Sequence, residues 1–131
     1  MTANMFDKLN SQQIKAVKIV SGPVMAVAGA GSGKTRVLTN RVAYLIDEIG
    51  IPPSDILAIT FTNRAAEEMR HRVFQLVRFP VQTMWISTFH AMGAKILRSD
   101  IHHLGYGNNF QIIDDEDSVI VVKKLLKDMN Y

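Results

Sequence analysis

The chain has 131 residues, a formal net charge of +3 and 47% hydrophobic residues, so it is long enough for one domain with a hydrophobic core. The absence of cysteine excludes disulfides and thiolate metal sites and fits a cytoplasmic location. No apolar run is long enough to span a membrane, so we expect no membrane partner.

The first predicted element is a short helix that begins after Asn10. Asparagine is a favourable N-cap, and Gln13 lies three residues further on, where it can complete a capping box. Apolar residues at helical spacing, Val17 among them, predict one buried face. Residues 21–23 (Ser-Gly-Pro) end this helix, and the apolar run at 24–27 predicts the first strand.

A glycine-rich stretch, Ala-Gly-Ala-Gly-Ser-Gly-Lys-Thr at residues 28–35, separates that strand from an amphipathic helix that runs to Ile49. A strand, a glycine-rich loop and a helix in this order are the context of a phosphate-binding loop. Backbone N–H groups of the small residues and of the helix N-terminus surround phosphate oxygens. Lys34 would reach the outer phosphates, and the Thr35 hydroxyl would ligate Mg²⁺.

The first position of this loop is Ala28, where the usual G-x-x-x-x-G-K-[ST] pattern has glycine. A flexible glycine turn before a helix is therefore the alternative interpretation. The residues that we expect to surround the nucleotide phosphates are Gly29, Ala30, Gly31, Ser32, Gly33, Lys34 and Thr35.

The later elements alternate between strands and helices. In order, they are a strand at 56–59, a helix capped by Asn63 and followed by Pro80, a strand at 84–87, a helix through Arg98, a loop over 100–109, a candidate fourth strand at 110–113 and a helix from 115 to about 129. This alternation predicts an α/β fold, in which helices flank a parallel sheet. Because ligands bind beyond the carboxyl ends of such strands, residues 28–35, 61–63 and 88–90 should share one rim.

Residues 110–115 permit two interpretations. An apolar strand followed by Asp114 and Asp115 resembles a Walker B motif, which would make the chain a self-contained small P-loop nucleotide-binding domain or kinase-like ATPase. However, Gln111 interrupts the apolar run, and Asp114 with Asp117 also has the spacing of a helix cap.

Basic residues are concentrated in the middle of the chain. Between residues 64 and 98 there are six lysines and arginines against two glutamates, Glu67 and Glu68. This distribution is compatible with a polyanionic partner, and equally with a solvated helix face.

Four motifs in order resemble those of the UvrD/PcrA/Rep helicases. Residues 9–17 (L-N-x-x-Q-x-x-A-V) are similar to the Q motif, and 28–36 to motif I, where alanine at the first position is usual. Residues 59–66 resemble motif Ia, and 85–90 resemble the next DNA-contacting motif. The resemblance implies a superfamily-one DNA helicase that uses ATP and Mg²⁺ to translocate 3′ to 5′ on single-stranded DNA.

The resemblance also implies roles for individual residues. Gln13 would read the adenine edge, and Arg36 would stack on the adenine. The residues expected to contact single-stranded DNA are Phe61, Thr62, Asn63, Thr88, Phe89 and His90. Aromatic faces bind successive bases by stacking, which suits Phe61 and Phe89, although without the resemblance each would be assigned to the core.

The family's Walker B carboxylates, arginine fingers and second motor domain find no match in this sequence. We therefore expect residues 1–113 to be the N-terminal part of the first RecA-like motor domain, and residues 114–131 to begin the inserted accessory helical subdomain. The remainder of the helicase chain would be the partner, and this chain alone should not turn over ATP.

Overall fold

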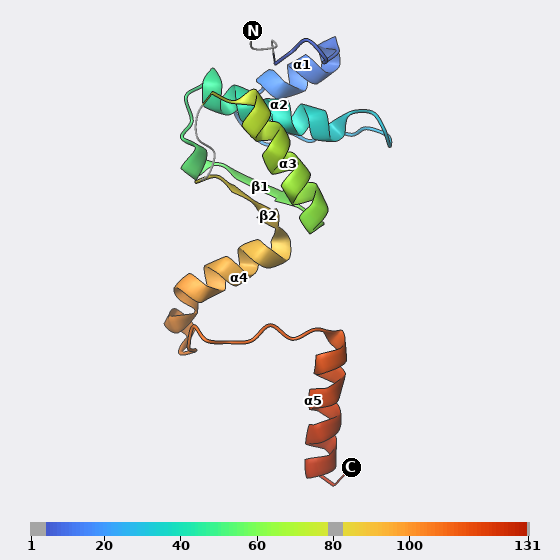
Figure 1. Cartoon of the computed structure of the whole chain (residues 1–131), viewed down its shortest axis with the longest axis vertical. Helices are drawn as coiled ribbons and strands as arrows, with labels where there is room; N and C mark the ends of the chain where they lie inside the picture. Colours follow the sequence, from blue (N-terminus) through green and yellow to red (C-terminus); the bar gives the residue numbers. More distant parts are fainter. Residues whose placement is uncertain (1–4, 79–82, 131) are drawn as a thin grey trace. The chain divides into compact units, whose positions relative to one another are not determined.

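The computed structural model describes residues 5–78 and 83–130 (Figure 1). The described elements, in order, are α1 (Ser11–Lys18), α2 (Lys34–Asp47), the 3-10 turn η1 (Pro53–Asp55), β1 (Leu57–Thr60), α3 (Asn63–Leu76), β2 (Trp85–Thr88), α4 (Phe89–Asp100), the 3-10 turn η2 (Ile101–Leu104) and α5 (Asp115–Asp128). They form two compact units, residues 1–92 and 93–131, and the boundary falls within α4.

The sheet of the first unit consists of β1 and β2, which pair in parallel. Leu57 lies opposite Trp85 at one end of the pair, and Thr60 lies opposite Thr88 at the other. Helix α3 connects the two strands, as a parallel connection requires. The predicted strands at 56–59 and 84–87 are thus confirmed, although each is displaced by one residue. The predicted α/β fold class is confirmed as well.

The hydrophobic core of the first unit lies where α3 packs against both strands and α2 packs against α3 (Figure 1). Its buried members are Val42, Ile46, Ile56, Ala58, Ala66, Met69, Val73, Met84 and Ile86. Met69 and Val73 are one helical turn apart on α3, which is the spacing that the sequence pattern predicts for an inner face. Helix α1 packs against α2 and buries Val17 completely.

The predicted strand at residues 24–27 does not form. Met25 and Val27 are each 87% exposed, and the segment belongs to neither strand of the sheet. A strand exists only where its backbone groups pair with a neighbour, and in the described part of the chain neither β1 nor β2 pairs with this segment. Residues 24–27 therefore have the composition of a strand but, among the described residues, no neighbouring strand with which to form hydrogen bonds.

The prediction of a strand at 110–113 is also wrong. These residues have an irregular backbone, and Ile112 is 68% exposed. The physical reason is the same, since among the described residues no strand pairs with this segment.

The N-cap of helix α3 lies one residue earlier in the chain than the predicted N-cap, Asn63. The N-cap is Thr62, whose hydroxyl accepts a 3.2 Å hydrogen bond from the Ala65 N–H, and Asn63 is the first helical residue. Thr62 has the extended backbone that an N-cap requires, with φ −117° and ψ 150°. The predicted stop at Pro80 lies outside the described residues.

Helix α2 ends as the sequence predicts. Its last residue is Asp47, and Gly50 adopts a left-handed φ of +81°, which glycine adopts without a steric cost. The Ile51 N–H then donates to the Leu45 carbonyl at 2.9 Å and closes the end of the helix.

In the second unit, the described part of residues 93–131 buries no side chain. Helix α5 has a capping box in which the Asp117 N–H donates to the Asp114 carboxylate at 2.8 Å, and the Asp114 N–H donates to the Asp117 carboxylate at 3.4 Å. None of the helices described is both long and apolar enough to cross a membrane.

Candidate functional site

The glycine-rich loop turns twice through backbone conformations that favour glycine. Gly31 and Gly33 have φ values of +72° and +87°, in the left-handed region where a Cβ would be strained. Between them, the Ser32 hydroxyl donates to the Gly29 carbonyl at 2.6 Å and fixes the turn. The last of these glycines, Gly33, is the N-cap of α2.

Helix α2 begins without a side-chain cap, in contrast to the other described α-helices. Asn10, Thr62, Thr88 and Asp114 each accept a hydrogen bond at the start of α1, α3, α4 and α5, whereas Gly33 has no side chain to offer. The first turn of α2 also contains no acidic residue. Its first N–H groups and the positive end of its dipole are therefore directed at the loop, which is the arrangement that binds an anion.

Lys34 adds a full positive charge inside the same loop. Its Nζ donates to the carbonyl oxygens of Ala28 at 2.9 Å and Gly29 at 2.6 Å. The exposed side chain therefore folds back over the loop. A lysine at the first position of α2, with its ammonium at the loop, is suited to bind the outer phosphates of a nucleotide.

A cavity of about 560 Å³ adjoins the loop, within the range of small-molecule sites. Gln13, Ser32 and Lys34 supply polar groups, and Val24 and Val37 supply apolar surface. No aspartate or glutamate is among the described residues that line it. The cavity can therefore hold a ligand that has an apolar part and an anionic part.

Gln13 connects α1 to the loop. It forms the predicted capping box with Asn10, with both backbone-to-side-chain hydrogen bonds at 2.9 Å. In addition, its Nε2 donates to the Ser32 carbonyl at 3.0 Å. A Cβ on Gly33 would lie 3.1 Å from this Nε2, so glycine permits the close approach. The Gln13 amide retains one N–H and one oxygen lone pair beyond these bonds.

Arg36 does not line the same cavity as Gln13. Its Nη1 donates to the Lys8 carbonyl at 3.3 Å, and it lines a second cavity of about 340 Å³ between the N-terminal turn, α2 and α3. Thr35 is exposed in the first turn of α2. The structure thus places Gln13, Ser32 and Lys34 around one cavity and Arg36 at the other.

Phe61 and Phe89 are both exposed, at 83% and 58% of their surface. Each follows the last residue of its strand, and these last residues, Thr60 and Thr88, are paired with each other. The register therefore places the two rings at one edge of the sheet, as the strand-end rule predicts. The assignment of these rings to the core, which the sequence would suggest without the family resemblance, is therefore wrong.

The polar residues beside these rings divide into two groups. Asn63 and His90 are exposed. Thr62 and Thr88 use their hydroxyls to cap α3 and α4, and Thr88 is only 5% exposed, with its hydroxyl 3.2 Å from the Ala91 N–H. The Thr88 side chain therefore stabilises the fold and is not presented to a ligand.

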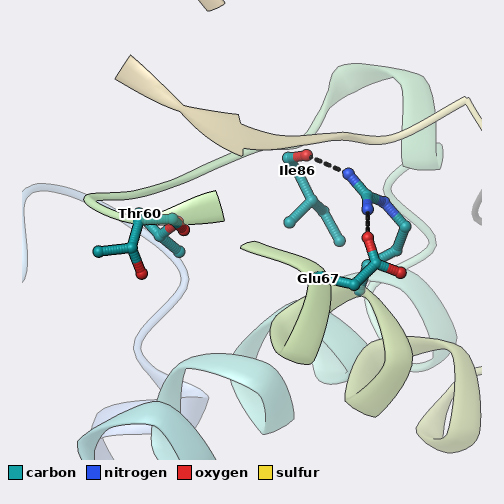
Figure 2. Close-up of polar contacts among 5 residues, drawn as sticks. Thr60, Glu67 and Ile86 are labelled. Carbon is teal, nitrogen blue, oxygen red and sulfur yellow. Dashed lines mark hydrogen bonds and ion pairs between the residues drawn. The ribbon is translucent and has the colours of Figure 1, made fainter. Parts of the chain in front are cut away.

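Part of the basic middle of the chain is used internally. Arg70 forms an ion pair with Glu67 and donates to the Ile86 carbonyl at 2.7 Å, which ties α3 to β2 (Figure 2). Arg72 pairs with Glu68 on the same helix. Both arginines are partly exposed but already have partners within the chain, so the charge pattern alone does not indicate a polyanion site.

The Walker B interpretation of residues 110–115 is also wrong. Asp114 accepts the N-cap hydrogen bond of α5 and does not follow a strand. The described residues include no cluster of three or more histidine or carboxylate side chains that could hold a metal ion.

Sequence reasoning missed Arg41, which also lines the cavity. Its guanidinium binds carbonyl oxygens at the end of α1. No local signal could have revealed the contact, because the partners are more than twenty residues apart.

The glycine-rich loop lies at the start of α2, beside the unit formed by β1, α3 and β2 with its parallel strands. This arrangement defines part of an α/β domain of the RecA-like class. Residues 9–131 match the family described as the UvrD/REP helicase N-terminal domain. The chain belongs to this family.

The chain is similar to bacterial helicases over most of its length. It is 50% identical over 126 residues to the ATP-dependent DNA helicase PcrA of Staphylococcus aureus (strain Mu50), which is 96% of this chain and 17% of that protein. It is 53% identical over 122 residues to the ATP-dependent DNA helicase PcrA of Staphylococcus epidermidis (strain RP62A), which is 93% of this chain and 17% of that protein. The chain therefore spans about a sixth of the length of these relatives.

Proposed function

We propose that the chain is the N-terminal ATP- and single-stranded-DNA-binding portion of a 3′ to 5′ DNA helicase, which couples ATP hydrolysis to translocation and duplex unwinding. The observation that carries the proposal is the start of α2, where uncapped N–H groups and the Lys34 ammonium converge on one loop. Membership of the UvrD/REP family supports it, as does the similarity to PcrA proteins that are named ATP-dependent DNA helicases.

In this proposal, residues 29–35 bind the phosphates of ATP through backbone N–H groups and Lys34. The donor set fits a polyphosphate, since it offers N–H groups and an ammonium and no competing carboxylate. The Thr35 hydroxyl would be a ligand of Mg²⁺, which commonly binds through substrate phosphates and few protein groups. Gln13 would contact the adenine edge with the N–H and lone pair that its structural bonds leave over.

We further propose that single-stranded DNA binds along the edge formed by Phe61 and Phe89. Exposed rings at paired strand ends can stack on bases without selecting a sequence. Asn63 and His90 lie beside the rings in the chain and are exposed, so they can contact the strand. Thr62 and Thr88 would act indirectly, because their hydroxyls hold the helix starts that follow each ring.

Hydrolysis requires groups that the described cavity does not contain. A carboxylate that polarises water or binds Mg²⁺ is not among the lining residues, and Asp114 caps a helix. We therefore propose that the remainder of the helicase chain supplies them. We also retain the division into a motor-domain portion at 1–113 and the start of an accessory subdomain at 114–131.

Salt titration of DNA binding tests the DNA part of this proposal. A fluorescently labelled oligothymidine is mixed with the 131-residue chain, and its anisotropy is measured at low and at raised salt. We expect weak binding that falls as salt rises, because phosphate contacts release counterions. An oligothymidine that remains free at low salt would contradict the assignment of this edge to DNA.

A further inference from the structure

Arg41 joins α2 to the far end of α1. Its Nη1 donates to the Ala16 carbonyl at 2.9 Å, lies 3.5 Å from the Val17 carbonyl, and also donates to the Ile19 carbonyl. Ala16 and Val17 belong to the last turn of α1, and Ile19 is its C-cap. One guanidinium thus satisfies carbonyl groups that a helix end leaves without intrahelical partners.

The contact also has a favourable electrostatic basis. The C-terminal end of a helix carries partial negative charge, which a cation stabilises. Among the described residues, the ion pairs are those of Arg70 and Arg72, so Arg41 has carbonyls and not a carboxylate as its partners. All three contacts are made by Nη1, which the planar guanidinium holds in a fixed geometry that a flexible lysine ammonium reproduces less well.

Helix α1 is therefore held at both ends. At its start, Gln13 donates to the Ser32 carbonyl of the loop, and at its end Arg41 binds the terminal carbonyls. The helix has only 8 residues, and Val17 is its one buried residue. Because so short a helix has little stability of its own, its position depends on these attachments together with the packing of Val17 against α2.

We infer that Arg41 is a positioning residue, which holds α1 so that the Gln13 amide stays on the loop and can select the base of a bound nucleotide. The inference about base selection rests on the proposed ATP site, whereas the inference about the position of Gln13 does not. Arg41 acts through Gln13, and its own hydrogen bonds go to the protein backbone.

The first measurement needs no nucleotide. In the 131-residue chain, the side-chain NH₂ resonances of Gln13 are followed by NMR in wild type and in Arg41→Met. We expect them to move toward the positions of a free amide in the variant, while the melting temperature shows that the core remains folded. Arg41→Lys should give an intermediate shift, and it decides the question if Arg41→Met does not fold.

Arg64→Met is the matched control, since it removes the same charge from an exposed position on α3. It should leave the Gln13 resonances unchanged. Unchanged resonances in both Arg41 variants would overturn the inference.

The second measurement compares the affinities for ATP and GTP. Loss of one neutral hydrogen bond changes affinity by roughly two- to tenfold, so we expect the ATP preference to fall by this factor in Arg41→Met, as it should in Gln13→Ala. Triphosphate binding that depends on Lys34 should persist. If Arg41→Met weakens ATP and GTP equally, Arg41 contacts the ligand directly and the positioning role is wrong. If wild type binds neither nucleotide, the proposed ATP site fails, and the NMR result still decides the position of Gln13.

Discussion

Substitution of Phe61 by alanine separates DNA binding from folding. The ring is 83% exposed, so its removal should change the free energy of unfolding by no more than about 0.5 kcal/mol. If a base stacks on it, the same change should cost about 1–3 kcal/mol of DNA affinity, or roughly 5- to 150-fold in Kd. The structure thus predicts a large effect on binding with almost no effect on stability.

The assay pairs anisotropy of a labelled oligothymidine with thermal melts. Two variants serve as controls. Phe74→Ala removes an equally large ring that is 58% exposed near the other end of α3, and it should leave DNA affinity unchanged. Met69→Ala empties a core position that is 2% exposed, and it should cost about 2–5 kcal/mol of stability. Equal losses of affinity in Phe61→Ala and Phe74→Ala would refute the reasoning, because binding would then follow exposed aromatic surface in general.

Three further predictions concern the loop, α5 and ATP turnover. Gly33→Ala should destabilise the chain by about 1–2 kcal/mol in thermal melts, because φ is +87° and the new Cβ would lie 3.1 Å from Gln13 Nε2. Gly93→Ala, in helix α4, where the new Cβ would meet nothing within 4 Å beyond the backbone of its own helix, should instead be neutral or stabilising. The opposite order would show that the loop conformation is mistaken. Asp114→Ala should lower the stability of α5 by about 1 kcal/mol in circular dichroism melts through loss of its cap. Phosphate release should stay negligible in wild type and in Asp114→Asn, and robust turnover that Asp114→Asn abolishes would restore the Walker B interpretation.

The sequence predicts the local parts of this fold well, because they depend on neighbouring residues. The capping boxes at Asn10 and Asp114 involve residues three positions apart, and both form as their spacing indicates. The apolar runs at Leu57–Thr60 and Trp85–Thr88 form strands as predicted, because the two runs pair with each other. Even the error at α3 is local, since Thr62 and Asn63 are both competent caps and the backbone conformation decides between them.

The failures concern contacts between distant parts of the chain. Residues 24–27 have the apolar composition of a buried strand, and composition does not reveal whether a neighbouring strand is present. The same holds for the Arg41 contacts with α1 and for the hydrogen bond from Gln13 to Ser32. The position of Arg36, apart from Gln13, likewise depends on how the N-terminal turn packs against α2.

Calorimetric titration of Mg·ATP into wild type and Lys34→Ala tests the central claim most directly. Lys34 is the only cation whose ammonium binds the carbonyl oxygens of Ala28 and Gly29 among the described residues, so its loss leaves the loop without a full positive charge. We predict weak binding to wild type and no detectable binding to Lys34→Ala, with the melting temperature of the free protein little changed because the side chain is exposed. Equal affinity of the two proteins for Mg·ATP would contradict the assignment of residues 28–35 as the nucleotide site.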